Sequence, residues 1–243
     1  MPSLFPPALL AAAGLAFIGG VIRGFTGFGT PLFLAPTYAV LFGPAATVPL
    51  IILQEIGATL LTIRDAWPRA DRQEMSGFLL GCIPMMPIGA ALLGILDPNL
   101  VKKVMSFITL GFVAALWSGW RYRGPRTAPV RVGLGALSGL TTGLAGIGGP
   151  PVVLYHVSGD KDPAAIRGNL VVYFSILTVV IVPVFAYRGL VTVETLWRCV
   201  VVTPPLLLGV AVGMRLFHGA TERRYVNAAL LVLLTGALIG LIG

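Results

Sequence analysis

The chain has 243 residues, of which 56% are hydrophobic and only 11% are charged. Soluble domains carry roughly 25% charged residues, so the composition excludes both a soluble enzyme and a disordered chain. Several runs contain no charged residue, and most of them approach the ~20 apolar residues that a helix needs to cross a bilayer: Met75–Leu96, Val104–Trp120, Gly168–Tyr187, Cys199–Met214 and Tyr225–Gly243. The composition therefore predicts an all-α, multi-pass membrane protein.

The formal charge of +8 does not indicate nucleic-acid binding. The basic residues fall mainly in short loops between apolar runs, which is typical of the positive-inside rule, and they do not form one stripe. Cys82 and Cys199 lie within apolar runs, and the sequence has neither a disulfide framework nor metal-ligand spacing. We expect no nucleic-acid partner, no metal and no other cofactor; the lipid bilayer is the expected surroundings of the chain.

The second half of the chain matches the first at a shift of about 119 residues. The matched pairs keep one order along the chain: Gly14 with Gly133, Gly20 with Gly139, Gly24 with Gly143, Gly27 with Gly146, Gly29 with Gly148, Pro31 with Pro150 and Pro44 with Pro163. Shifts of 120 and 121 later pair Pro84 with Pro204 and Lys102-Lys103 with Arg223-Arg224. Such an ordered series predicts an internal duplication.

Each predicted repeat has a hairpin of two apolar arms around a Gly-rich break, and three longer helices follow it. Repeat 1 covers 1–120, with its hairpin at 8–42 and helices at 44–64, 75–96 and 100–120. An Arg-rich linker covers 121–131, and repeat 2 covers 130–243, with its hairpin at 130–158 and helices at 163–187, 195–216 and 222–243. The arms Val130–Thr142 and Pro150–Val157 would cover only about half of a ~30 Å core, which predicts re-entrant hairpins. The longer arm Ala8–Arg23 leaves a full crossing open.

Three crossings per half is an odd number, so the second repeat is expected to be inverted relative to the first. With the linker in the cytoplasm, twelve basic residues fall on the cytoplasmic side and four on the other, as the positive-inside rule requires. The cytoplasmic set is Arg64, Arg69, Arg72, Arg121, Arg123, Arg126, Arg131, Lys161, Arg167, Arg215, Arg223 and Arg224, and the opposite set is Lys102, Lys103, Arg188 and Arg198. Full crossings by every hairpin arm would instead make the repeats parallel.

The two breaks are candidate anion sites. They read Arg23-Gly-Phe-Thr-Gly-Phe-Gly-Thr-Pro31 and Thr142-Gly-Leu-Ala-Gly-Ile-Gly-Gly-Pro150. Backbone groups freed by a break inside a membrane must be buried in protein or face a wet cavity. Because a proline after each break can start a helix, two helix N-termini with free N–H groups would meet near the midplane. Close helix packing through small residues is the alternative explanation for these glycines.

Polar side chains within the apolar runs extend this candidate site. Arg23 can bind an anion or pair with a carboxylate, and it is costly in a membrane if unpaired. Gln54, Asn169 and Tyr173 are expected on equivalent helix faces toward the breaks. Asn169 and Tyr173 can equally make structural hydrogen bonds between helices. Glu55 is a candidate proton carrier or the fixed partner of Arg23. The predicted substrate-binding residues are Arg23, Thr26, Gly27, Gly29, Thr30, Gln54, Gly146, Gly148, Gly149, Asn169 and Tyr173.

At these residues the sequence resembles the TauE/SafE family of sulfite exporters. The resemblance rests on Gly24-Phe-Thr-Gly-Phe-Gly29 with Pro31, on the matching segment Gly143 to Pro151, and on Ala165-Ile-Arg-Gly-Asn-Leu170. It implies a multi-pass transporter, not an enzyme, in the bacterial inner membrane that carries sulfite or small organosulfonates. Thr30 stands where the second copy has Gly149, so the two halves of the site need not be equivalent.

The leading hypothesis is therefore an exporter of small sulfur-containing oxyanions with a midplane site between the two hairpin tips. A passive anion channel shares this site, and a membrane enzyme acting on phosphorylated lipids is a further alternative. The direction of transport, its coupling ion and the formation of a homo-oligomer are left open by the sequence.

Overall fold

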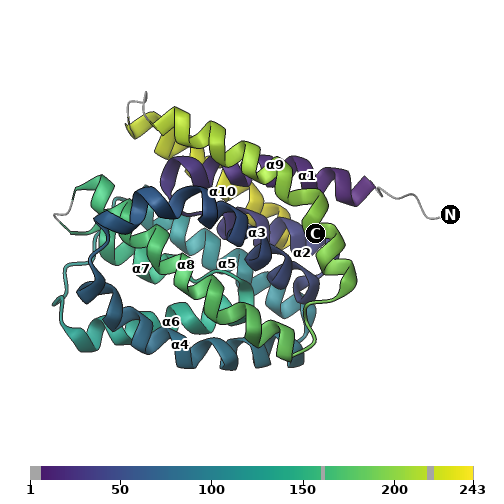
Figure 1. Cartoon of the computed structure of the whole chain (residues 1–243), viewed down its shortest axis with the longest axis horizontal. Coiled ribbons are helices and arrows are strands. Elements are labelled where there is room, and N and C mark those ends of the chain that lie inside the picture. The colour runs from purple at the N-terminus through teal and green to yellow at the C-terminus, as the bar shows by residue number, and fades with distance from the viewer. Residues whose placement is uncertain (1–6, 160–161, 218–221, 243) are drawn as a thin grey trace.

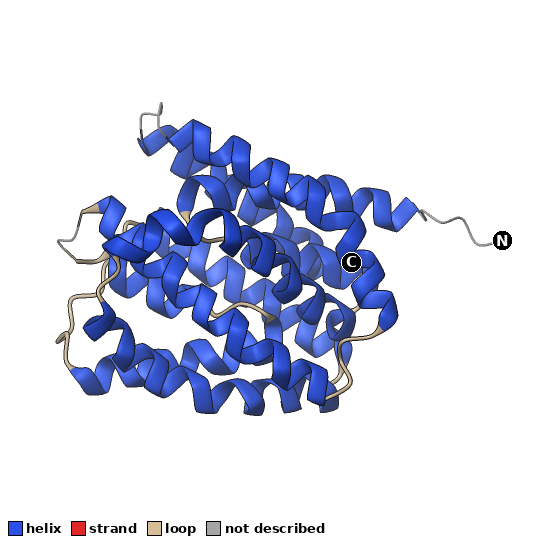
Figure 2. Cartoon of the chain, in the orientation of Figure 1, coloured by secondary structure: helices blue, strands red, loops and turns tan. Residues whose placement is uncertain are grey.

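The computed structural model describes residues 7–159, 162–217 and 222–242, and all regular structure within them is helical (Figures 1 and 2). Lys161 lies outside these residues, and the side chains of Arg223 and Arg224 lie outside the described ones. The helices are α1 (Pro7–Thr26), α2 (Thr30–Phe42), α3 (Pro44–Ala66), α4 (Arg72–Ile95), α5 (Pro98–Trp117), α6 (Ala128–Ala145), α7 (Gly149–Val157), α8 (Pro163–Tyr187), α9 (Val193–Phe217) and α10 (Glu222–Ile242), and a short 3-10 turn, η1 (Trp67–Arg69), follows α3. The predicted all-α class is confirmed.

Local sequence explains where the helices start. Pro31, Pro44, Pro98 and Pro163 each stand in the first turn of a helix, where the missing N–H costs nothing. Acidic side chains cap the helices that begin in loops. The carboxylates of Asp71, Asp97 and Asp162 accept hydrogen bonds from backbone N–H groups at the starts of α4, α5 and α8. Three of the nine acidic residues of this chain thus serve as helix caps.

Six helices of the described residues are long and apolar enough to cross a membrane: α1, α3 with η1, α4, α5, α8 and α9. Five of these are predicted crossings, and α1 is the arm whose crossing the sequence left open. For α10 the assessed stretch is Leu230–Ile242, an apolar segment shorter than a full crossing. The chain is a multi-pass membrane protein, and the re-entrant course of its hairpins stays a prediction.

The first arm of the second hairpin is longer than the sequence predicts. It was expected at Val130–Thr142, whereas α6 has 18 residues and continues to Ala145, a rise of ~27 Å. Gly143 by itself would favour an end of the α6 helix before that residue. An added Cβ on Gly143 would lie 2.2 Å from the carbonyl oxygen of Met86, so tertiary packing with α4 requires this glycine inside the helix. Only α7, with nine residues, is as short as expected.

The two tightest helix pairs join the halves of the chain. Helix α1 packs along α9 at one edge of the molecule, and α6 packs along α4 at the other, with α3 and α8 in contact between them (Figure 1). Glycines permit both contacts: a Cβ on Gly20 or Gly24 would lie within 2.2 Å of a carbonyl oxygen of α9, and one on Gly139 would do the same against α4. Close helix packing therefore explains these repeated glycines.

Candidate functional site

The two breaks have the same local geometry at their first glycine. The N–H of Gly27 donates to Arg23 O at 2.8 Å, and that of Gly146 donates to Thr142 O at 2.9 Å. Their φ angles are +80° and +71°, a conformation that side chains with a Cβ disfavour. The second glycines differ, because φ is +103° at Gly29 and −92° at Gly148. Both breaks thus end a long helix and start a short one, α2 or α7.

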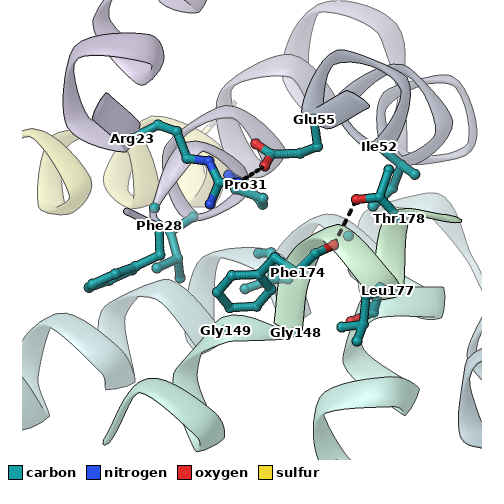
Figure 3. Close-up of a pocket in the computed structure, with 15 residues that line it drawn as sticks. Arg23, Phe28, Pro31, Ile52, Glu55, Gly148, Gly149, Phe174, Leu177 and Thr178 are labelled. Atoms are coloured by element: carbon teal, nitrogen blue, oxygen red, sulfur yellow. Dashed lines mark hydrogen bonds and ion pairs between the residues drawn. The ribbon is translucent and has the colours of Figure 1, made fainter. Parts of the chain in front are cut away.

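Both breaks line one cavity, which we call the inner cavity (Figure 3). Its volume is about 40 Å³, a few times the ~10–15 Å³ that one water molecule requires. The predicted site residues that line it are Arg23, Gly29, Glu55, Gly146, Gly148 and Gly149. The start of α2 and the start of α7 meet there, and neither helix has a side-chain cap. The N-termini of two helices, where backbone N–H groups lack partners within the helix, therefore meet at the same small space.

Arg23 and Glu55 form an ion pair at the wall of the inner cavity (Figure 3). Arg23 Nη2 lies 3.1 Å from Glu55 Oε2, and the two side chains are 1% and 5% exposed. Arg23 Nη1 also donates to the carbonyl oxygen of Gly27 at 2.5 Å. Within the described residues, Arg23 Nε and Glu55 Oε1 are buried without hydrogen-bond partners. Such atoms are costly to bury, and Arg23 Nε could still donate to a bound oxyanion.

The other predicted side chains of the first repeat, those of Thr26, Thr30 and Gln54, do not line the inner cavity. The hydroxyl of Thr26 donates to Ile22 O at 2.8 Å and accepts from the N–H of Phe28 at 3.2 Å. Thr30 is fully buried at the start of α2, and its hydroxyl has no hydrogen-bond partner among the described residues. Gln54 is also fully buried, and its amide donates to Val202 O of α9 at 3.3 Å.

Asn169 and Tyr173 make hydrogen bonds between helices, the structural role that the sequence left open, and neither lines the inner cavity. Asn169 Oδ1 accepts from the N–H of Asp71 at 2.7 Å, and its amide donates to Glu74 at 3.3 Å. Tyr173 donates to the hydroxyl of Ser138 at 2.9 Å, which donates to Gly148 O at 2.6 Å. Tyr173 thus supports the second break through Ser138, outside the inner cavity.

Several residues of the inner cavity had no signal in the sequence. Phe28, Ile147, Phe174, Leu177 and Thr178 line it, but an apolar or threonine side chain in an apolar run is not distinctive. Phe174 and Thr178 are joined by a hydrogen bond from the threonine hydroxyl to the Phe174 carbonyl oxygen at 2.9 Å (Figure 3). Arg167 contacts the other side of the first break, where its guanidinium donates to Gly24 O at 3.2 Å.

Comparison with known proteins identifies the family. The model of the family "Sulfite exporter TauE/SafE" matches residues 12–241. The chain belongs to the TauE/SafE sulfite exporter family. It is also similar to the "Probable sulfite/organosulfonate exporter TauE" of Cupriavidus necator, with 23% identity over 234 residues that cover 89% of this chain and 88% of that protein. No solved structure matches the chain.

Membership confirms the family that the motifs resemble and makes the chain a membrane transporter. It is not an enzyme, so the alternative of a phosphorylated-lipid enzyme is set aside.

Proposed function

We propose that this chain exports sulfite or a small organosulfonate across the bacterial inner membrane and binds it in the inner cavity. The observation that carries the proposal is that both Gly-rich breaks and one buried guanidinium, that of Arg23, line the same small cavity. The starts of α2 and α7 add the positive ends of two helix dipoles. The Cupriavidus relative is named for sulfite and organosulfonate export, which supports this substrate class.

The cavity fits the head of such an anion. A volume of about 40 Å³ holds a few water molecules or one compact oxyanion. Arg23 would bind the anion through charge-assisted hydrogen bonds, and the N–H groups after Gly29 and Gly148 would bind its other oxygens.

Glu55 would couple transport to protons by competing with the anion for Arg23. An anion that approaches the guanidinium must displace the Glu55 carboxylate or repel it. Protonation of Glu55 removes that competition, so a proton and an anion would bind more tightly together than either does alone. The ion pair at 3.1 Å supports this linkage, because both partners already share one site.

The two halves of the chain would act as inverted repeats that rock against each other. Matched positive φ angles at Gly27 and Gly146 support the duplication. So does the packing of each half's first helix on the other half, α1 on α9 and α6 on α4. In many inverted-repeat transporters, discontinuous helices form the binding site near the bilayer midplane, at the interface of the repeats. A homo-oligomer is compatible with this arrangement but is not required by it.

Flux of labelled sulfite or methanesulfonate in proteoliposomes tests the function. We expect saturable flux that a proton gradient accelerates and that is lost when Arg23 and Glu55 are both replaced by glutamine. No flux of any small oxyanion by folded protein would contradict the proposal. Non-saturating currents in planar bilayers would instead favour the passive anion channel.

A further inference from the structure

A second and larger cavity lies on the other side of the first break. Its volume is about 470 Å³, and we call it the vestibule. The vestibule is lined by the ends of α1, α5 and α7, the loop after α5, the start of α8 and the middle of α10. Its lining residues include Thr26, Phe112, Arg121 and Arg167. Two guanidinium groups thus line the vestibule, and Arg23 lines the inner cavity.

Phe28 lines both the inner cavity and the vestibule. Among the described residues that line the inner cavity and the vestibule, Phe28 is the one common to both. Its ring points away from Glu55 (Figure 3) and meets Phe112 edge to face, with ring centres 5.9 Å apart. The inner cavity and the vestibule therefore approach each other at Phe28.

Glycine stands on both sides of Phe28 in the backbone. Gly27 and Gly29 flank it with φ angles of +80° and +103°, and glycine can leave and regain such angles at little steric cost. The carbonyl oxygen of Gly27, directly before Phe28, accepts the hydrogen bond from Arg23. A shift of Arg23 toward a bound anion would therefore weaken the bond that holds the peptide of Phe28.

We infer that Phe28 is the gate between the vestibule and the inner cavity, and that the state of Arg23 controls it. The inference rests on the proposed function for its meaning in transport, but the barrier itself is a property of the cavities. Ile147 is the matched residue of the second break; it lines the inner cavity and does not line the vestibule. Bulk at Ile147 should therefore be irrelevant to access from the vestibule.

Thiol protection in a cysteine-free background tests the gate without any transport substrate. Cys82 and Cys199 are first replaced by serine, and Thr178→Cys then places a thiol in the inner cavity, whereas Leu116→Cys places one in the vestibule. Purified protein is treated with silver ion in chloride-free buffer, and the remaining thiols are counted with a maleimide after unfolding. Silver ion is small enough to enter a cavity of this size.

With Phe28 present, we expect the Leu116→Cys thiol to react rapidly and the Thr178→Cys thiol slowly. Phe28→Ala should raise the rate at Thr178→Cys at least about tenfold, Phe28→Leu should raise it less, and Ile147→Ala should leave it within about twofold. Rapid reaction at Thr178→Cys with Phe28 intact would overturn the inference, and so would equal acceleration by Phe28→Ala and Ile147→Ala. The Phe28→Leu arm decides the matter if Phe28→Ala fails to fold.

Failure here and failure of the proposed function are distinguishable. A silver result that contradicts the gate leaves anion flux and its dependence on Arg23 untouched. Conversely, a chain that carries no sulfur oxyanion can still show the barrier at Phe28.

Discussion

The ion pair of Arg23 and Glu55 sets the chemistry of the inner cavity at the scale of single residues. Each charge is buried, and each offsets much of the desolvation cost of the other. Removing one partner leaves the other charge buried and unpaired, which typically costs ~3–5 kcal/mol. Variants at this site must therefore separate loss of binding from loss of folding.

Arg23→Gln alone should destabilise the protein for this reason, whereas Arg23→Gln combined with Glu55→Gln should fold. In the double variant we expect affinity for methanesulfonate to fall about ten- to more than a hundredfold, because a charge-assisted contact contributes roughly 1.5–3 kcal/mol. Titration calorimetry of the detergent-solubilised protein measures this loss. Glu55→Gln, which keeps Arg23, is the reference; it leaves Arg23 unpaired and should also be destabilised, so both variants are titrated below their melting temperatures. Equal affinities in the two variants would assign Arg23 to structure alone.

Glu55→Gln should remove the pH dependence of binding while keeping the anion site. In the parent chain, affinity for methanesulfonate should rise as pH is lowered, because protonation of Glu55 ends its competition for Arg23. The charge of this sulfonate is constant over the range, so the change reports on the protein. Glutamine mimics the protonated acid, and its affinity should be high at every pH. A variant that keeps the pH dependence of the parent would exclude Glu55 from coupling.

At the scale of helices, glycine performs two different tasks in this chain. In α6, Gly139 lets the backbone approach α4, and an added Cβ would lie 2.1 Å from Cys82 O. Gly133 of the same helix has nothing within 4 Å of such a Cβ. Gly27 and Gly146 serve the breaks instead, through their positive φ. Glycines that repeat at the same spacing in the sequence are thus required for different reasons: some allow close helix contact, and others adopt a positive φ at a break.

Gly139→Ala should therefore destabilise the protein by roughly 1–3 kcal/mol, the usual cost of overpacking a close contact. Gly133→Ala is the matched control on the same helix, and we expect it to be neutral or to stabilise the helix by up to about 1 kcal/mol. Thermal unfolding in detergent compares the two variants. Equal melting temperatures for both would show that the contact of α4 and α6 is looser than the structure indicates.

For the whole molecule, the halves of the chain depend on each other. Helix α1 has its closest contact with α9, and α6 has its closest contact with α4, so neither half contains the main partner of its own first helix. The loop that joins the halves is exposed at Arg123 and Gly124. We therefore expect the helix contacts, rather than the covalent connection in this loop, to hold the two halves together.

Fragments 1–123 and 124–243, expressed together, should assemble into a complex with the flux of the intact chain. Either fragment alone should be degraded or aggregate, because α1 or α6 would lack its glycine-mediated contact. Co-purification through a tag on one fragment measures assembly. A first fragment that is stable and monodisperse alone would contradict the interdependence of the halves.

The sequence by itself determined the class of this protein and the ends of most of its helices. Scarce charge and long apolar runs force a helical membrane protein, since a bilayer offers backbone groups no other partners. The predicted helix starts at Pro44 and Pro163 agree with the structure, because a proline stands in the first turn of each helix. The Asp97 cap, which starts the next helix at Pro98 rather than at residue 100, was missed. The spacing of the Gly-rich breaks marked both halves of the cavity. The motifs also sufficed to identify the family, because they span the two breaks and the start of α8.

Only the tertiary structure decided which polar residues share the inner cavity. Gln54, Asn169 and Tyr173 have the right periodicity, but they hydrogen-bond to other helices, because helix rotation is set by packing across the molecule. Arg23 and Glu55 are 32 positions apart, and their pairing depends on how tertiary packing places α1 relative to α3. The length of α6 and the place of Phe28 between two cavities likewise follow from contacts between the halves, which no local pattern encodes.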